Sequence, residues 1–350
     1  MSKTTLKDIA NHVGVSITTV SRVLNGQAEQ HRIKKQTEEA ILTAAKELGF
    51  SPYKSIFKPP MARSKTIGLI IPDISHFFLS HLARTIRLEI HQADYSVLIV
   101  DSREDTETEK ESIDLLLRQN VDGLIILPVG KEWKHIQDVY NRGVPLVVVD
   151  RIMPELNCPS VGIDNYSGAR EAMDYLVARG HTTIACIQRL PDSWINDERL
   201  RAYRDALNSK NIQIDESLII GDTFGQKNGY LEGKLLLSRP KKPTAIFALS
   251  HVLTLGLLQV FREEKLHIPE DVSLISFDDL PFSEYFELKV TTVKQPVTEM
   301  GLMAVNLLLD QINSPGRSDP VHIKLRTTFI RRESVKNLPQ NSPAGVGTPT

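Results

Sequence analysis

The stretch from Thr5 to Asn25, TLKDIANHVGVSITTVSRVLN, predicts two short helices joined by a tight turn. Thr5 and Asp8 have the spacing of a capping box at the start of the first helix. Apolar residues then recur at helical spacing along one face, namely Leu6, Ile9, Ala10 and Val13. Gly14 is expected to end this helix, because a left-handed backbone costs least at a residue without a Cβ.

The second helix is expected to begin after Ser16, which is a good capping residue, and to have two different faces. Its apolar face holds Val20, Val23 and Leu24. The opposite face is polar except for one isoleucine and ends in a guanidinium; it holds Ile17, Thr18, Ser21 and Arg22. Two short helices with a glycine turn are typical of a helix-turn-helix, whose second helix lies in the major groove of DNA. An ordinary helical hairpin would show the same apolar pattern.

The segment LKDIANHVGVSITTVSRVLNG, residues 6–26, resembles the opening of the lactose/galactose repressor family of bacterial transcription regulators. Its polar positions match that family as well as its apolar ones; they are Asp8, Ser16, Thr19, Ser21, Arg22 and Asn25. The loop over residues 27–31 is most similar to the fructose- and sucrose-responsive branch. The resemblance implies that operator DNA is contacted by Thr5, Ser16, Ile17, Thr18, Thr19, Ser21, Arg22 and Asn25. Ile17, Thr18 and Arg22 are expected to read base edges.

A third helix is expected over residues 32–48, whose apolar face consists of Ile41, Leu42, Ala45 and Leu48. It would complete a small all-α domain over residues 1–50. Residues 1–65 carry 11 Lys and Arg against 5 Asp and Glu, a net charge of +6, whereas the rest of the chain carries −7. A basic head on an acidic body suits a DNA-binding head, because phosphate neutralisation supplies most of the sequence-independent affinity.

Residues 51–65, SPYKSIFKPPMARSK, are expected to form a hinge or linker. In the family that the head resembles, this stretch folds into a hinge helix on DNA and inserts a leucine into the minor groove. Here Pro59 stands at the position of that leucine and Pro60 follows it. Proline inside a helix costs about 3 kcal/mol. The hinge helix is therefore expected either to be shorter, with Ile56 or Phe57 as the wedge, or not to form.

The composition is that of an ordinary soluble chain, with 41% hydrophobic and 24% charged residues among 350. No apolar run is long enough to span a membrane and the N-terminus is polar, so neither an anchor nor a secretory signal is expected. Cys158 and Cys186 lie far apart and fit no metal-binding spacing. They are expected to be buried, reduced thiols in a cytoplasmic protein, and no metal or cofactor is predicted.

From Thr66 onward, apolar runs alternate with amphipathic stretches. Runs such as TIGLIIP and PLVVVD lack period-2 alternation, which indicates strands buried on both faces of a parallel sheet. The helix expected over residues 104–119 opens with a charge run, which is interpreted as a solvated face. The scheme repeats in a second half. The predicted fold class is therefore an all-α helix-turn-helix head plus an α/β body, like a periplasmic binding protein, with two doubly wound parallel-sheet subdomains.

The body is expected over residues 66–333. Its first subdomain would contain residues 66–160 with 292–321, and its second residues 161–291 with 322–333. A single last strand, HIKLRTTFI, would return across both halves. Residues 334–350 are rich in Pro, Gly, Ser and Asn and are expected to be a disordered tail. The tail lacks the leucine heptads that make the lactose repressor a tetramer, so the resemblance implies a homodimer.

Polar residues at the carboxyl ends of strands are the candidates for holding a small ligand. They are Asp73, Asp150, Arg151, Asp164, Asn165, Ser250, His251, Asp278 and Asp279. Carboxylates accept hydrogen bonds from vicinal hydroxyls, and arginine adds a planar fork of donors. Any one such residue can equally be a helix cap or a solvated loop side chain.

The resemblance supports a ligand-binding role for some of these residues and adds further candidates. Arg199 matches the effector-binding arginine of the family's RLxGF-like motif, although Ala202 replaces the glycine. Asp278 matches the sugar-binding aspartate, and Phe77 or Phe78 matches a pocket aromatic. Where the family has Asn-Asp, this chain has Ser250 and His251, which favours an anionic effector such as a sugar phosphate or a sugar acid. The predicted effector-binding residues are Asp73, Phe77, Phe78, Asp150, Trp194, Arg199, His251 and Asp278, with Trp194 as a stacking platform or a core aromatic.

The sequence therefore predicts a transcriptional regulator, by analogy a repressor, that binds a palindromic double-stranded operator and a small carbohydrate-type effector. A solute-binding protein of a sugar transporter is the alternative; it accounts for the body but not for the head. An enzyme is not expected, because the chain has no GxGxxG after a strand, GxxxxGK[ST], GxSxG or HExxH motif.

Overall fold

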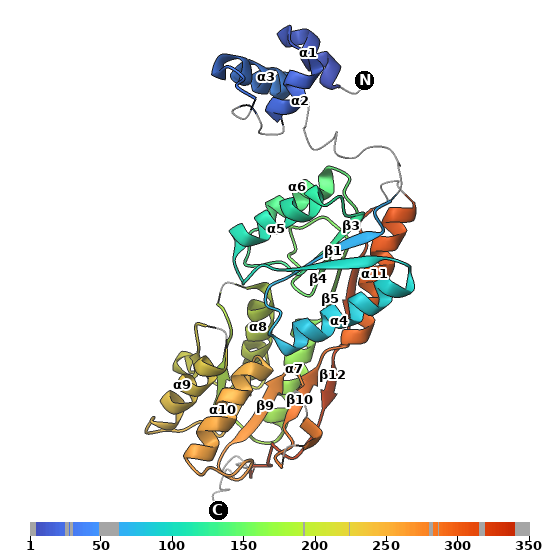
Figure 1. Cartoon of the computed structure of the whole chain (residues 1–350). Helices are drawn as coiled ribbons and strands as arrows, with labels where there is room; N and C mark the ends of the chain where they lie inside the picture. Colours follow the sequence, from blue (N-terminus) through green and yellow to red (C-terminus); the bar gives the residue numbers. More distant parts are fainter. Residues whose placement is uncertain are drawn as a thin grey trace, which may run out of the picture. The chain divides into compact units, whose positions relative to one another are not determined.

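The computed structural model describes residues 5–24, 28, 31–48, 63–191, 193–223, 225–279, 283–285, 287–314 and 319–339. The chain divides into two compact units (Figure 1). The first is built on residues 1–64 and is called the head; the second is built on residues 65–140 and 144–350 and is called the body. Among the described residues, no helix is both long and apolar enough to cross a lipid bilayer.

The head is a bundle of three helices: α1 (Leu6–Val13), α2 (Ile17–Leu24) and α3 (Lys35–Glu47). The capping box is confirmed, because the Asp8 amide donates to Thr5 Oγ1 (3.3 Å) and the Thr5 amide donates to the Asp8 carboxylate (2.7 Å). Gly14 ends α1 with a φ of +73°. The core consists of Ile9, Ala10, Val20, Val23, Ala28, Ile41, Ala44 and Ala45. Leu42 was expected in this core but is 49% exposed, because Ala44 occupies the buried face of α3 instead.

The body has two lobes, each built on a six-stranded sheet. The first lobe has the strand order β11-β5-β4-β3-β1-β2, and all its pairings are parallel. Its central strands are buried along their whole length, as predicted from their unbroken apolar runs. Helices α4 and α11 pack on one face and α5 and α6 on the other. Its elements are β1 (Thr66–Ile71), α4 (Phe77–Gln92), β2 (Ser96–Asp101), α5 (Thr106–Arg118), β3 (Gly123–Ile126), α6 (Lys134–Asn141), β4 (Leu146–Val149), β5 (Ser160–Ile163), α11 (Val297–Asn313) and β11 (His322–Leu325).

The second lobe has the strand order β12-β10-β9-β8-β6-β7, in which only the β10–β12 pairing is antiparallel among the described strands. Helices α7 and α8 cover one face and α9 and α10 the other. The two doubly wound subdomains predicted from the sequence are therefore confirmed. The elements are α7 (Asn165–Ala178), β6 (Ile184–Ile187), α8 (Trp194–Asn208), β7 (Ile219–Ile220), α9 (Gln226–Leu237), β8 (Ala245–Ala248), α10 (His251–Glu263), β9 (Ser273–Phe277), β10 (Thr291–Lys294) and β12 (Thr328–Ile330), with short 3-10 turns at Glu216–Leu218 and Ser283–Tyr285.

Within the described part of the body, the chain crosses between the lobes at three places, and these differ from the predicted boundaries. β5 pairs with β4 and β11 in the first sheet, so the first crossing follows Ile163. β10 pairs with β9 and β12 in the second sheet, so residues 291–294 belong to the second lobe. The expected single last strand is in fact two strands, β11 in the first sheet and β12 in the second, separated by Arg326 and Thr327. Periodicity identifies strands, but only pairing assigns each strand to a sheet.

The first residues of the expected disordered tail are part of the second lobe. Ser334 is fully buried; its hydroxyl donates to the Leu274 carbonyl (2.6 Å) and accepts from the Thr291 amide (2.8 Å). Further along, the Leu338 amide donates to the Arg179 carbonyl (2.8 Å). The predicted start of the tail at Ser334 is therefore wrong, because this segment continues the backbone pairing of the lobe. Residues 340–350 lie outside the described residues.

Candidate functional site

In the head, α2 presents the surface that the sequence predicted. Val20 and Val23 are buried, whereas Ile17 is 47% exposed and Thr18 and Arg22 are also exposed. The remaining described candidates serve the helix ends or flank this face. Ser16 Oγ accepts from the Thr19 amide (3.0 Å) and bonds the Thr19 hydroxyl (2.8 Å), and Thr5 caps α1; Ser21 is half-buried. Asn25, Ile56, Phe57, Pro59 and Pro60 lie outside the described residues.

In the body, residues of both lobes line a partly open cavity. Most of them follow the last residues of strands, at the edge where open α/β sheets bind ligands. Asp150 and Arg151 follow β4, while Arg189, Asp278 and Gln295 follow β6, β9 and β10. The complete lining is His76, Phe78, Leu79, Glu104, Asp150, Arg151, Arg189, Asp278 and Gln295.

Asp150 and Asp278 occupy equivalent positions in the two lobes. Each is the first residue after a central strand, and each has a left-handed backbone, with φ of +69° and +67°. This conformation is uncommon for residues other than glycine, and it concentrates at functional sites. The matching geometry places one buried carboxylate from each lobe on the same cavity.

The surroundings of the two carboxylates differ. Asp278 accepts a hydrogen bond from Gln295 Nε2 (2.5 Å) and lies 3.6 Å from His251 Nδ1. Asp150 is 5% exposed, and no N–H or O–H of the described residues donates to its carboxylate. Burial raises the pKa of Asp150, and the charge of Asp278 adds to this, while the neighbouring arginines oppose it. Asp150 is therefore a carboxylate of the cavity wall to which none of the described residues donates a hydrogen bond.

The Arg151 guanidinium is hydrogen-bonded to other protein groups. Its Nη1 and Nη2 donate to both oxygens of Glu104 at 2.6 and 2.5 Å, and Nη1 also donates to the Pro128 carbonyl (3.2 Å). Burial alone would raise the pKa of Glu104, but the hydrogen bonds and the charge of Arg151 outweigh it and lower the pKa. The predicted solvated face of the charge run is therefore wrong at Glu104, and also at Glu109, which is 0% exposed and bonds His135 and the Val129 amide.

Arg199, in α8, is fully buried. Its Nε donates to Asn165 Oδ1 (2.9 Å), its Nη1 donates to the Leu249 carbonyl (2.7 Å), and the guanidinium carbon lies 3.4 Å from the centre of the Phe277 ring. Burial lowers its pKa to about 9, so it remains charged at neutral pH. Its Nη2 is buried and has no hydrogen-bond partner among the described residues. The Nη2 group of Arg199 is therefore a hydrogen-bond donor that the described residues leave unused.

Two histidines meet where the lobes face each other. His76 precedes α4 in the first lobe and His251 begins α10 in the second, and their ring centroids are 4.9 Å apart. Burial lowers the pKa of His76 to about 3, and the charges of His251 and Arg189 contribute to this. His76 is therefore neutral at physiological pH. Phe77 lies 6.4 Å from the His251 ring and is 42% exposed.

A second cavity adjoins the first and shares Arg151 and Arg189 with it. Its other walls are mainly apolar; the remaining lining residues are Gly130, Met153, Leu190, Ser193, Trp194 and Ile195. Trp194 is the first residue of α8, which begins there because Ser193 Oγ accepts from the Asn196 amide (3.2 Å). Near these residues, Lys131 of the first lobe and Asp197 of the second form an ion pair of 3.2 Å.

The structure thus gathers most of the predicted effector residues. Phe78, Asp150 and Asp278 line the first cavity, Trp194 lines the second, and Arg199 and His251 are buried beside Phe277 and Asp278. Asp73 is engaged in a turn, because its carboxylate accepts from the Ser75 amide (2.8 Å) and hydroxyl (2.7 Å). Asp164 caps α7 by accepting from the Ser167 amide (2.9 Å).

Five residues that line the first cavity were not predicted from the sequence, namely His76, Leu79, Glu104, Arg189 and Gln295. Arg189 and Gln295 follow strands, so the rule that selected Asp150 would also have found them. Glu104 and His76 lie in loops that precede helices, and no local signal separates them from ordinary loop residues.

Comparison with known proteins agrees with both units. Residues 5–53 match the family described as bacterial regulatory proteins, lacI family, and residues 173–335 match a periplasmic binding protein-like domain. The chain is 33% identical over 308 residues to the HTH-type transcriptional repressor CytR of Escherichia coli (strain K12), an alignment that covers 88% of this chain and 89% of that protein. It also resembles the transcriptional regulator CelR in its cellobiose complex, with a TM-score of 0.72, 30% identity and coverage of 95% and 100%. A LacI family transcriptional regulator from Enterococcus faecium with bound ribose gives a TM-score of 0.70, 29% identity and coverage of 78% and 100%.

Proposed function

The chain belongs to the lacI family of bacterial regulatory proteins, and we propose that it is a homodimeric repressor whose affinity for a palindromic operator is set by a carbohydrate-type effector bound between its lobes. That it is a transcriptional regulator follows from its relatives, which are regulators and not enzymes. The solute-binding alternative is not supported, because residues 5–53 match the regulators' own DNA-binding family. Such a protein acts on chromosomal DNA in the cytoplasm.

The buried Asp150 carboxylate is the observation that carries the effector proposal. It lines the cavity and accepts no hydrogen bond from the described residues, so a ligand donor can bind it without breaking a hydrogen bond within the protein. Hydroxyl groups are suitable donors, and a polyhydroxyl ring can reach Asp150 in the first lobe and Asp278 in the second together, because both line the same cavity. A ligand that bonds both carboxylates favours the closed arrangement of the lobes, since the open one offers it only one of them.

The arginines favour an effector that also carries an anionic group. Arg189 and Arg151 line both cavities, and the buried Arg199 adds positive charge beside Asp278. A sugar phosphate or a sugar acid supplies the hydroxyl donors and a strong acceptor in one molecule. The indole of Trp194 in the adjoining cavity offers an apolar surface to the face of a sugar ring.

The head supplies the other half of the function. The exposed face of α2 carries the groups that read base edges in the major groove, and Arg22 is suited to a guanine. The body is connected to this head through residues 49–64 of the same chain. Effector-driven closure that changes the spacing of two such connections in a dimer would alter operator affinity; couplings of this kind are about 1–3 kcal/mol.

The test begins with genomic DNA fragments that the purified full chain retains at about physiological salt, where non-specific binding is weak. We expect retention of a fragment with a palindrome, and its release by one member of a panel of D-ribose, cellobiose, D-ribose 5-phosphate and D-gluconate. Arg22→Met should abolish retention and leave binding of the sugar compound unchanged. No retained fragment, with or without the panel, would refute the regulator; retention that no panel member alters would refute the effector class.

A further inference from the structure

We propose that Arg332, at the C-terminal end of the body, is a positioning residue of the effector site that holds Asp278 through the neighbouring Asp279. The proposal rests on the proposed function, because it takes Asp278 as a ligand-binding carboxylate. Arg332 is itself absent from the lining of both cavities.

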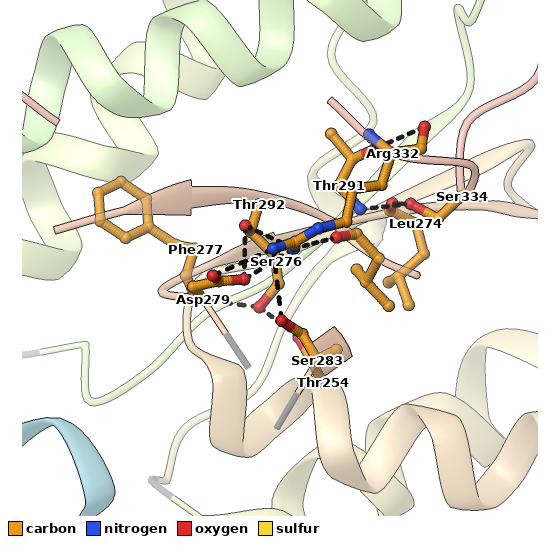
Figure 2. Close-up of polar contacts among 11 residues, drawn as sticks. Thr254, Leu274, Ser276, Phe277, Asp279, Ser283, Thr291, Thr292, Arg332 and Ser334 are labelled. Carbon is orange, nitrogen blue, oxygen red and sulfur yellow. Dashed lines mark hydrogen bonds and ion pairs between the residues drawn. The ribbon is translucent and has the colours of Figure 1, made fainter. Parts of the chain in front are cut away.

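The contact between Arg332 and Asp279 is a planar fork (Figure 2). Arg332 Nη1 donates to Asp279 Oδ1 (2.7 Å) and Nη2 donates to Asp279 Oδ2 (3.1 Å). Thr292 Oγ1 donates to the same Oδ1 (2.9 Å). Burial alone would raise the pKa of Asp279, but the hydrogen bonds of Arg332 and Thr292 outweigh it, so the pKa is lowered. Asp279 therefore stays ionised and paired.

The same guanidinium also bonds two groups that follow Asp279 in the chain. Its Nη1 also donates to the Val290 carbonyl (2.7 Å), just before β10, and Nη2 donates to Ser283 Oγ (3.3 Å). The Arg332 amide donates to Thr291 Oγ1 (3.0 Å), as Figure 2 shows at the start of β10. One side chain thus ties together the segment after β9 and the segment that leads into β10.

These two segments are the ones that position the ligand carboxylate. The Asp278 amide donates to the Val293 carbonyl of β10 (2.9 Å), and the Asp278 side chain accepts from Gln295 (2.5 Å), which follows β10. Asp278 holds an uncommon left-handed φ of +67°, which persists only where the surroundings enforce it. Asp279, whose carboxylate binds Arg332, is the next residue in the chain, so the fork directly restrains the backbone conformation of Asp278.

Arg332 also lies just beyond a crossing between the lobes. It follows β12 of the second sheet, and β12 follows β11 of the first sheet after only two residues, Arg326 and Thr327. A rotation of the lobes that pulls on this crossing is transmitted along β12 to Arg332. The Arg332–Asp279 fork therefore couples lobe closure to the placement of Asp278.

Hydrogen exchange of the ligand-free full chain tests the positioning role without any effector. Arg332→Met should speed amide exchange in peptides covering residues 276–279 and 291–295, and Arg332→Lys should restore part of the protection, because lysine keeps the charge but not the fork. Arg331→Met is the matched control, since Arg331 is exposed and packs on Tyr175 instead. Unchanged exchange at residues 276–279 would overturn the proposal, as would an equal increase in β8, which would mean a general loss of stability.

Binding measured with the same panel supplies the functional arm. Arg332→Met should weaken the tightest panel ligand about 3- to 30-fold, Asp279→Asn should act in the same direction, and Arg331→Met should have no effect. Operator affinity without ligand should be unchanged in Arg331→Met. Wild-type ligand affinity in Arg332→Met would overturn the positioning role. If no panel member binds the wild-type protein, the proposed effector class fails, and the exchange experiment still decides the role of Arg332.

Discussion

Replacement of Asp150 by asparagine should stabilise the ligand-free protein and weaken effector binding at the same time. The side chain keeps its shape, so the change removes a charge and little else. In the wild-type protein this carboxylate is 5% exposed and receives no hydrogen bond from the described residues. A residue that served only to hold the fold together would show the opposite sign of stability change.

The sign of the stability change follows from linkage. Burial raises the pKa of Asp150, so the folded protein binds a proton at this site more readily than the unfolded chain does. The ionised carboxylate therefore destabilises the folded state at neutral pH, and the destabilisation fades as the pH falls through the raised pKa toward the ordinary value of 3.8. A neutral asparagine removes it at every pH. We expect a gain of about 1 kcal/mol from removing a buried charge to which none of the described residues donates a hydrogen bond, which corresponds to a rise of roughly 2–4 °C in melting temperature.

The loss of affinity follows from the hydrogen bonds that a ligand hydroxyl would make. A hydrogen bond to a charged group contributes about 1.5–3 kcal/mol, so its weakening should reduce effector affinity roughly 10- to 150-fold. Calorimetric unfolding and isothermal titration on the same preparations would measure both effects. Scans at falling pH should show the stability difference shrinking, because the wild-type carboxylate then becomes protonated.

Asp164→Asn is the matched control. Asp164 also follows a strand of the first sheet, but its carboxylate accepts from the Ser167 amide (2.9 Å) and hydroxyl (2.7 Å) and caps α7. Burial tends to raise its pKa, but these hydrogen bonds outweigh it, so its ionised form stabilises the fold. The control should lose a little stability and no effector affinity. A lower melting temperature for Asp150→Asn, or wild-type affinity in that variant, would refute the role assigned to Asp150.

Three further outcomes are expected. Lowering the pH from 7 to 5 should weaken effector binding up to roughly 30-fold. Burial between the lobes holds the pKa of His76 at about 3, whereas a solvated His76 in opened lobes would titrate near 6.5 and gain a proton. Effector affinity of His76→Gln should change little over this pH range, and an equally steep pH dependence in that variant would assign the effect to another group. Gly256→Ala should destabilise the body by about 1–3 kcal/mol, because a Cβ would lie 2.1 Å from the Gln226 carbonyl where α9 and α10 pack together, and an unchanged melting temperature would contradict that packing. Arg22→Ala should weaken operator binding by about 1–3 kcal/mol and relax the preference at one base pair, as measured by binding to a set of singly substituted operators; a uniform loss over all of them would indicate a phosphate contact instead.

The sequence was most informative where local spacing decides the structure. The capping box at Thr5, the glycine end of α1 and the two faces of α2 depend on residues three or four positions apart, and each is present as predicted. The unbroken apolar runs predicted the buried parallel strands, and this too is a local signal. A strand that is buried on both faces is apolar at every position and shows no alternation. The strand-end rule located Asp150 and Asp278, because the carboxyl ends of parallel strands share one edge.

Only the tertiary structure decided what depends on partners distant in the chain. Residues 322–330 read as one strand, yet the two halves pair in different sheets, because hydrogen-bond register with β5 and β10 is set by the whole fold and not by the strand's own side chains. Glu104 has the sequence signature of a solvated charge, but in the structure it pairs with Arg151. Ser334 has the signature of a disordered tail, but its hydroxyl bonds β9 and β10. A charged or polar side chain has the same local sequence signature whether water or a buried partner satisfies it, so long-range contact alone distinguishes a surface residue from one that builds the site.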